Sequence, residues 1–264
     1  RSTSSSRDGL TLSKDDVSQI TVSDRAATTA FYGNAYVLPR LGEGTLPLTT
    51  VNVSEVDLQL LRVNDRNLVP KIVQSAVGDV LWSSDVWDVA NTQGAEVWAG
   101  KMSIADDRNK SVVTGIPVST MLPSPEPGVY ILSATNAKDE SGGDEYDDGY
   151  YYEDTPPATQ WLVVTDIGLA TFTGLDGLHV AVRSLDTGKP AANVELTLIA
   201  RNNEVLGEAT SDADGIASFP IGVISGAGGQ RPAAMLAYGR DDFSFLELTG
   251  SAFDLSARGV SGRA

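Results

Sequence analysis

Residues 178–200 read Leu-His-Val-Ala-Val-Arg-Ser-Leu-Asp-Thr-Gly-Lys-Pro-Ala-Ala-Asn-Val-Glu-Leu-Thr-Leu-Ile-Ala, and this stretch decides the fold. Its apolar residues fall on alternate positions in two runs: Leu178, Val180 and Val182, then Val194, Leu196 and Leu198. A period of two is typical of a β-strand with one buried face. Gly188-Lys-Pro190 supplies a turn before the second run. The stretch therefore predicts two antiparallel strands.

The same pattern continues in both directions along the chain. Turns at Asn202-Asn203 and at 212–215 separate further short strands at 204–210 and 216–219, which predicts an antiparallel meander. Alternating residues from Val51 to Leu60, with a break or bulge at Ser54-Glu55, predict two more strands, and 161–165 predicts another. No crossover helix pattern separates these strands, so a parallel sheet is not expected. We predict an all-β protein made of tandem antiparallel β-sandwiches.

One segment has helical spacing instead. Residues 65–78 place four apolar side chains on one helical face: Ile72, Val73, Ala76 and Val77. Asp65 is the predicted cap and Gly78 the predicted end, so we expect a short helix over one end of the first sandwich.

Length and composition limit the possible functions. With 264 residues, 41% of them hydrophobic, the chain is long enough for two domains with their own cores. The net charge of −16 disfavours nucleic acid and anionic membranes as partners, because no basic patch can neutralise phosphate groups. The absence of cysteine excludes disulfides, thiolate metal sites and thiol nucleophiles. No apolar run reaches the roughly 18 residues that span a bilayer.

Changes in composition predict the domain boundaries. The first sandwich is assigned to 27–166 with an insertion at 138–157, and the second to 167–252, with a hinge at Asp166-Ile-Gly168. Residues 1–26 and 253–264 are predicted linkers. The polar start of the chain carries no apolar signal segment, and we expect it to be a cut within a longer protein.

The insertion at 138–157 is strongly acidic. It holds one lysine, Lys138, and eight carboxylates: Asp139, Glu140, Asp144, Glu145, Asp147, Asp148, Glu153 and Asp154. Such a run is typical of a solvated loop, since its charges repel one another and bury little apolar area. The alternative is a loop that binds a cation or a basic partner with the help of Tyr146, Tyr150, Tyr151 and Tyr152.

No catalytic, cofactor or metal site is predicted. His179 is the only histidine, lies opposite the apolar face of its strand and has no evident triad partner, so it is interpreted as a strand residue rather than a general base. Asp212-Ala-Asp-Gly215 begins like a calcium loop, but position 12 would be Val223, and a tight hairpin explains the same residues. Gly226, Gly228 and Gly229 lack the Lys-Ser/Thr of a phosphate loop.

The four tryptophans form a further set: Trp82, Trp87, Trp98 and Trp161. All sit in or beside apolar runs, so we interpret them as core or interdomain anchors rather than sugar-stacking platforms.

Several segments together resemble one family. They are Tyr36–Arg40, Thr45–Val53, Leu61–Leu68, Ala158–Leu169, Val182–Pro190, Arg201–Gly207, Thr210–Gly215, Asp241–Leu246 and Phe253–Gly259. Their order is similar to the N-terminal region of bacterial α2-macroglobulins across nearly all of residues 28–260. The resemblance implies macroglobulin-like domains, each an antiparallel sandwich of immunoglobulin or fibronectin type, and the last strand of a preceding domain at Gln19–Ser23.

The resemblance also implies a function for the parent protein. Members of the family are periplasmic, often lipid-anchored to the inner membrane, and are thought to trap proteases in bacterial defence when cleavage of a bait segment exposes a thioester. The thioester needs a cysteine, which this chain lacks, and the bait segment belongs later in the family's order. We therefore expect a monomeric, non-catalytic scaffold with no thioester and no bait region. Its expected partners are neighbouring macroglobulin domains and, through the parent, proteases, with no direct membrane contact.

Two other classes of protein remain open. An immunoglobulin-like module of a bacterial surface adhesin would share the Asp-Ala-Asp-Gly turn and the acidic balance, but it would also show near-identical repeats. A carbohydrate-binding module would place a coplanar tryptophan pair on one sheet face, and glycan titration would detect it.

Overall fold

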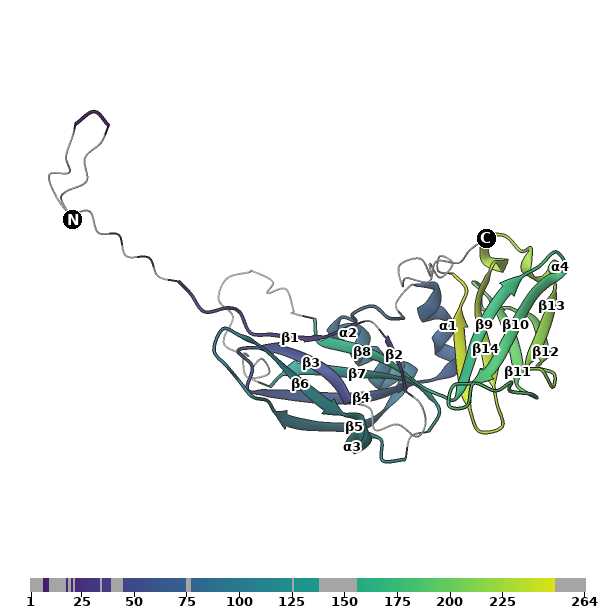
Figure 1. Ribbon diagram of the computed structural model, residues 1–264, viewed down its shortest axis with the longest axis horizontal. Coiled ribbons are helices and arrows are strands. Elements are labelled where there is room, and N and C mark those ends of the chain that lie inside the picture. Colours follow the sequence, from purple (N-terminus) through teal and green to yellow (C-terminus); the bar gives the residue numbers. More distant parts are fainter. Residues whose placement is uncertain are drawn as a thin grey trace.

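The computed structural model describes residues 7–9, 18, 20, 22–33, 35–38, 45–74, 77–124, 126–137 and 156–249. Two β-sandwiches follow one another along the long axis of the molecule, and helix α1 (Asp65–Val73) stands between them (Figure 1). The predicted linker 253–264 and most of 1–26 and of the acidic insertion lie outside the described residues. None of the described helices is both long and apolar enough to cross a bilayer.

The first sandwich packs a five-stranded sheet on a three-stranded sheet. The larger sheet has the order β2 (Ala35–Leu38), β8 (Ala158–Val164), β7 (Gly128–Asn136), β4 (Glu55–Val63) and β5 (Gly94–Ser103). The smaller one has the order β1 (Thr28–Phe31), β3 (Thr45–Val51) and β6 (Ser111–Pro117). Short helical elements connect the strands: α2 (Ser83–Asp88), the π-helical turn η1 (Val89–Gln93) and α3 (Val118–Met121). Leu48, Leu60 and Leu132 lie fully buried between the sheets.

The second sandwich packs a four-stranded sheet on a three-stranded sheet. The four strands are β12 (Val205–Thr210), β11 (Glu195–Ala200), β14 (Pro232–Tyr238) and β15 (Phe243–Glu247), and the three are β13 (Ile216–Pro220), β10 (Gly177–Ser184) and β9 (Ile167–Thr173). A helical turn, α4 (Ile221–Ile224), and a 3₁₀ turn, η3 (Gly228–Gln230), precede β14. Val180, Leu196 and Met235 are fully buried in its core.

The predicted all-β, antiparallel fold is confirmed, with one local difference. β2 and β8 pair in parallel, whereas the other described pairs of strands are antiparallel. The break near residue 54 is also present, but β3 already ends at Val51 and Asn52 has a φ of 53°.

The predicted meander is wrong. β10 pairs with β9 and β13, while β11 pairs with β12 and β14 in the opposite sheet. The chain therefore changes sheets after β10 and again after β12. A sheet with one apolar face needs a second layer that covers this face. Because β10 and β13 enter one sheet and β11 and β12 the other, the two sheets cover each other's apolar faces. The hairpin at Asn202-Asn203 is present, whereas the turn at 212–215 joins strands of different sheets.

The predicted helix is present, but its limits differ. Asn64, not Asp65, is the cap, and its side chain accepts a hydrogen bond of 3.1 Å from the Arg66 amide. The helix ends at Val73, and Gly78 lies in a later turn with a φ of 85°. Leu68 and Ile72 are fully buried.

Two of the four tryptophans are not the anchors that the sequence predicts. Trp161 is 1% exposed and Trp98 packs partly against the first core. Trp82, which caps the N-terminus of α2, is 58% exposed, and Trp87, within the helix, is 61% exposed. Val86 is the only residue of α2 that is buried, so the two tryptophans face solvent.

Candidate functional site

The single histidine has two partners that the sequence did not reveal. On β10, His179 Nδ1 lies 2.8 Å from Ser218 Oγ, and Nε2 lies 3.0 Å from Asp176 Oδ1. Ser218 is the cross-strand neighbour of His179 on β13, and Asp176 precedes β10 directly. The Phe172 ring stacks on the imidazole with centroids 5.1 Å apart. The expectation that His179 has no triad partner is therefore wrong as a statement of geometry.

Ser218, His179 and Asp176 are connected in the order of a nucleophile, a base and an orienting carboxylate. If Nε2 carries the proton and donates it to Asp176, Nδ1 accepts from the Ser218 hydroxyl. The hydrogen bond from His179 lowers the pKa of the Asp176 carboxyl. The cluster lies on the outer face of a sheet, where Ser218 and Asp176 are exposed. Acyl transfer also needs oriented donors for an oxyanion and a bound substrate, and the cavity described below lies elsewhere, beside the contact between the two sandwiches.

The acidic turn at 212–215 is held by its own hydrogen bonds. Asp212 Oδ1 accepts from the amides of Asp214 and Ile216, each at 2.9 Å, and Gly215 has a φ of 73°. This is an Asx turn, which explains the residues without a metal. Within the described ranges, no group of three or more His, Cys, Asp or Glu side chains is placed to hold an ion. The glycines near 228 lie in the turn before β14.

The contact between the two sandwiches, which we call the joint, is apolar. Helix α1 lies on the outer face of the five-stranded sheet and also meets the outer face of β14 and β15. One continuous cluster therefore contains buried residues of both sandwiches, among them Leu68, Ile72, Trp161, Ile199 and Leu236, with Phe243 and Phe245 packed against it.

Polar contacts cross the same joint. The Tyr238 hydroxyl on β14 donates to Asp65 Oδ2 of α1 at 3.0 Å. Burial, followed by the nearby Asp65 carboxylate, raises the pKa of Tyr238 to about 12. Asp242, in the turn between β14 and β15, accepts from Thr165 Oγ1 at 3.0 Å and from the Asp166 amide at 2.8 Å. Thr165 and Asp166 are the two residues that connect the sandwiches.

A cavity of about 490 Å³ lies beside the joint and is lined by both sandwiches. Its polar lining groups are largely engaged with other protein groups. Arg62 binds Glu126 at 2.6 Å and the Pro127 carbonyl at 3.1 Å, and Asn67 donates to the Gln93 carbonyl at 2.8 Å. Since these donors are already paired, the cavity offers a ligand few free polar contacts.

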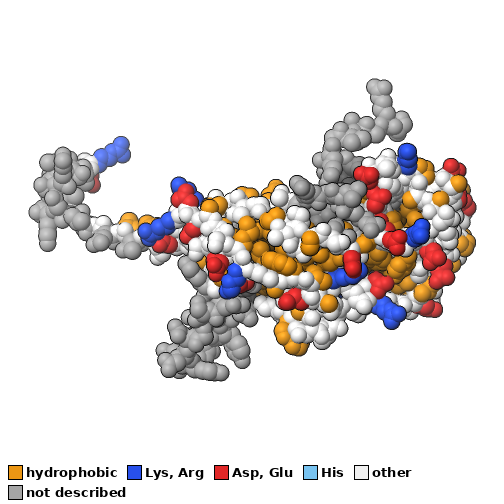
Figure 2. Space-filling view, turned by 90° about the horizontal axis from the view of Figure 1, so that it is seen from below, with side chains coloured by type: hydrophobic (Ala, Val, Ile, Leu, Met, Phe, Trp, Pro, Cys, Tyr) orange, Lys and Arg blue, Asp and Glu red, His pale blue; other side chains and the backbone are white. Residues whose placement is uncertain are grey.

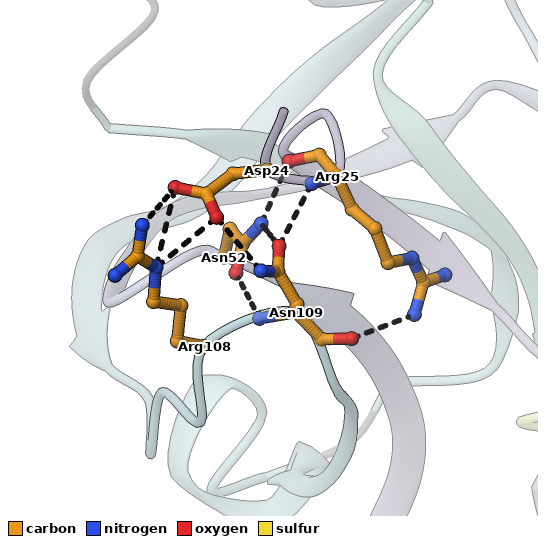
Figure 3. Close-up of polar contacts among 5 residues, drawn as sticks. All are labelled: Asp24, Arg25, Asn52, Arg108 and Asn109. Carbon is orange, nitrogen blue, oxygen red and sulfur yellow. Dashed lines mark hydrogen bonds and ion pairs between the residues drawn. The ribbon is translucent and has the colours of Figure 1, made fainter. Parts of the chain in front are cut away.

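At the opposite end of the first sandwich, five residues form what we call the N-terminal clasp (Figure 3): Asp24, Arg25, Asn52, Arg108 and Asn109. Asn109 Oδ1 accepts from the Arg25 amide at 2.7 Å, and Asn52 Nδ2 donates to the Arg25 carbonyl at 2.7 Å. The Arg108 guanidinium binds the Asp24 carboxylate at 2.6 Å and lowers the pKa of that carboxyl. Both asparagines have a positive φ, and their side-chain amides bind the backbone of Arg25.

Charge is dispersed over the surface. On the face shown in Figure 2, acidic side chains are scattered over the second sandwich with a few basic ones between them, and apolar side chains gather on the first. The Lys110–Asp107 pair, at 2.7 Å, is largely exposed, whereas the Lys101–Asp57 pair, at 3.1 Å, joins an exposed lysine to a partly buried aspartate. Exposed pairs contribute about 0–1 kcal/mol each. The view shows no gathering of Lys and Arg that would suit a polyanion.

Two family models match this chain, one on each of the two sandwiches. A model of the bacterial alpha-2-macroglobulin MG2 domain matches residues 30–138, and a model of the bacterial alpha-2-macroglobulin MG3 domain matches residues 164–264. Among curated proteins, the alpha-2-macroglobulin of Escherichia coli is 26% identical over 257 residues, covering 96% of this chain and 14% of that protein. The Xylella fastidiosa alpha-2-macroglobulin is 24% identical, covering 88% of this chain and 13% of the relative.

Solved structures show the same fold. Native E. coli alpha-2-macroglobulin spanning domains NIE-MG1 has a TM-score of 0.64 at 23% identity, covering 84% of this chain and 97% of that one. Salmonella alpha-2-macroglobulin reacted with methylamine has a TM-score of 0.64 at 22% identity, covering 94% of this chain and 13% of that one. The chain thus spans about 14% of the length of the E. coli relative.

Proposed function

The chain belongs to the bacterial alpha-2-macroglobulin family, and we propose that it is a non-catalytic structural segment of a protease-trapping protein of that family. The observation that carries the proposal is the order of the two family-model matches, which fall one on each sandwich of the structure. In this role the segment holds two macroglobulin-like domains in a fixed relative orientation and contributes no reacting group. We assign the domains to 27–166 and 167–252.

The joint supports a structural role more than a chemical one. Its buried groups are apolar side chains, and its polar groups bind other parts of the same segment. The absence of cysteine means that this segment cannot supply the sulfur of a thioester. We place the reactive bond and the bait segment elsewhere in the parent, and the parent itself in the periplasm, where a protease trap meets its attackers.

The structure adds little support to the two alternative functions, an adhesin module and a carbohydrate-binding module. A carbohydrate-binding module requires tryptophans on one sheet face, whereas the exposed Trp82 and Trp87 lie at and within α2. We therefore retain the protease-trap proposal alone.

A deletion in the full-length parent tests this function. We expect the intact parent to reduce cleavage of a large protein substrate by trypsin, and a parent that lacks residues 28–249 to lose this effect while its reactive bond stays chemically intact. A parent that never slows trypsin, or a deletion that leaves inhibition unchanged, would contradict the proposal.

A further inference from the structure

The residues that join the two sandwiches have little freedom. Only Thr165 and Asp166 separate β8 from β9. The Asp242 carboxylate binds the Thr165 hydroxyl and the Asp166 amide, and it also accepts from the Phe243 amide at 2.8 Å. A domain hinge works by large φ/ψ changes at a few such residues. Here those changes would break the hydrogen bonds that the carboxylate makes.

Asp166 makes two further hydrogen bonds to the second sandwich, to which Asp242 also belongs. Its carbonyl accepts from the Leu185 amide at 2.7 Å, and its carboxylate accepts from the Asp186 amide at 2.8 Å. The β14–β15 turn and the segment after β10 both belong to the second sandwich, so the connection is fixed to that sandwich and leads directly into β8 of the first.

The apolar surface of the joint opposes motion independently. Leu68 and Ile72 are fully buried and Leu236 is 6% exposed, within a cluster shared by both sandwiches. Relative motion is the default for neighbouring domains unless their interface is large and hydrophobic. Rotation at this joint would expose these side chains to water, at about 25 cal/mol for each Å² of apolar area.

We infer that the joint is an elbow of fixed angle, in which Asp242 pins the connection and α1 fills the space between the sheets. The described residues between 28 and 249 then move as one body. In a longer chain, any rearrangement must pivot outside this range, for example before the N-terminal clasp. This inference concerns the segment itself and holds whether or not the parent traps proteases.

Distance measurements on the isolated chain test the inference. The chain contains no cysteine, so Ser103→Cys on β5 and Glu208→Cys on β12, both exposed, allow spin labels at two chosen positions. Double electron–electron resonance is expected to give one narrow distance distribution. A broad or multiple distribution in this otherwise unaltered chain would overturn the inference.

A variant series tests the role of Asp242. Asp242→Ala removes the acceptor for both connecting residues, and we expect the narrow distribution to broaden while the apolar surface of the joint still limits the motion. Thr165→Val removes the hydroxyl that donates to Asp242 and accepts from the Ile167 amide, but leaves the bond between Asp242 and the Asp166 amide, so it should broaden the distribution less. The matched control is Asp241→Ala, since Asp241 is the exposed neighbour and its side chain, within the described part of the chain, pairs only with Arg240, at 4.0 Å. Circular dichroism confirms that each variant folds. An unchanged narrow peak in folded Asp242→Ala would refute the pinning role of this carboxylate.

Discussion

The hydroxyl of Tyr238, on the next-to-last described strand, donates a hydrogen bond of 3.0 Å to Asp65, the first residue of α1, although 173 positions separate them in the chain. This bond connects the second sandwich to the helix that belongs to the first. It lies at the edge of an apolar cluster that both sandwiches share. The two domains therefore share buried surface and polar contacts as well as a short connection.

Removing this hydroxyl should weaken the joint. We expect Tyr238→Phe to lower the free energy of unfolding by about 1 kcal/mol, the usual net value of one hydrogen bond. In a protein of this size that change shifts the Tm by about 2–4 °C. Calorimetry measures it, and Tyr130→Phe, which removes a hydroxyl bonded to the Glu126 carbonyl within the first sandwich, serves as the matched comparison. An unchanged Tm in Tyr238→Phe would show that the bond contributes nothing.

The same tyrosine predicts a dependence on alkaline pH. Its pKa is raised from 10.0 to about 12, so the folded protein holds the phenolic proton more tightly than the unfolded chain does. The resulting stability is complete below pH 10 and is lost as the pH rises through about 12. Urea unfolding of the wild type and of Tyr238→Phe across this range isolates the effect, because other titrating groups cancel in the difference. We expect the stability advantage of the wild type to shrink, and a constant difference would contradict the shift.

The acidic insertion should be dispensable for folding. β7 and β8 form an antiparallel pair in which Ala134 lies opposite Ala158, so the insertion lies between two paired strands. Replacing residues 139–155 with a short Gly-Ser turn removes eight like charges and leaves that pairing in place. We expect the Tm to hold or to rise slightly. A large fall in Tm would indicate that the tyrosines of the insertion pack on the first sandwich or that its carboxylates hold an ion.

The N-terminal clasp should protect one particular amide from exchange. The Arg25 N–H donates to Asn109 Oδ1, so we expect slow hydrogen exchange there. Asn109→Gly keeps the positive φ of 62° and removes the side-chain acceptor, so exchange at Arg25 should accelerate. Asn203→Gly is the matched control, because Asn203 also has a positive φ, of 66°, in a distant hairpin turn. Equal exchange in both variants would show that the clasp does not hold the incoming chain.

Ser218 should be unreactive despite its contact with His179. The pair lies on an open sheet face, away from the cavity at the joint. Nucleophilic catalysis also needs donors aimed at the developing oxyanion. We expect no labelling of the chain by a fluorophosphonate probe, as followed by mass spectrometry. Labelling of Ser218 that disappears in His179→Ala would instead reveal an activated serine.

The alternation of apolar and polar residues predicted the strands well, because whether a segment forms a strand depends mainly on residues that are close in sequence. The alternation at Leu178, Val180 and Val182 reflects one buried face, and β10 has that face. The same alternation carries no information about which sheet a strand enters, so the meander was a wrong prediction. The positive φ of Gly215 follows from the local Asp-Gly sequence, but the sheet change that follows it depends on the whole core.

The joint and the histidine cluster depend on contacts that are distant in sequence. Ser218 reaches His179 only through the register of β10 and β13, and Asp65 meets Tyr238 only once both sandwiches are folded. One signal was present in the sequence. Pro232 to Tyr238 is apolar at nearly every position, which is typical of a strand buried on both faces. β14 is such a strand, with Met235 in the second core and Leu236 in the joint.

The central claim, that this segment is structural and does not itself inhibit proteases, is tested most directly by incubating the purified chain with trypsin at equimolar concentration. Cleavage of a protein substrate and a denaturing gel of the mixture are then compared with trypsin alone. Covalent trapping requires an activated acyl group, and this chain has no cysteine to form a thioester. We predict an unchanged rate of substrate cleavage and no covalent adduct. A reduced rate, or a band that combines the chain with trypsin, would contradict the account.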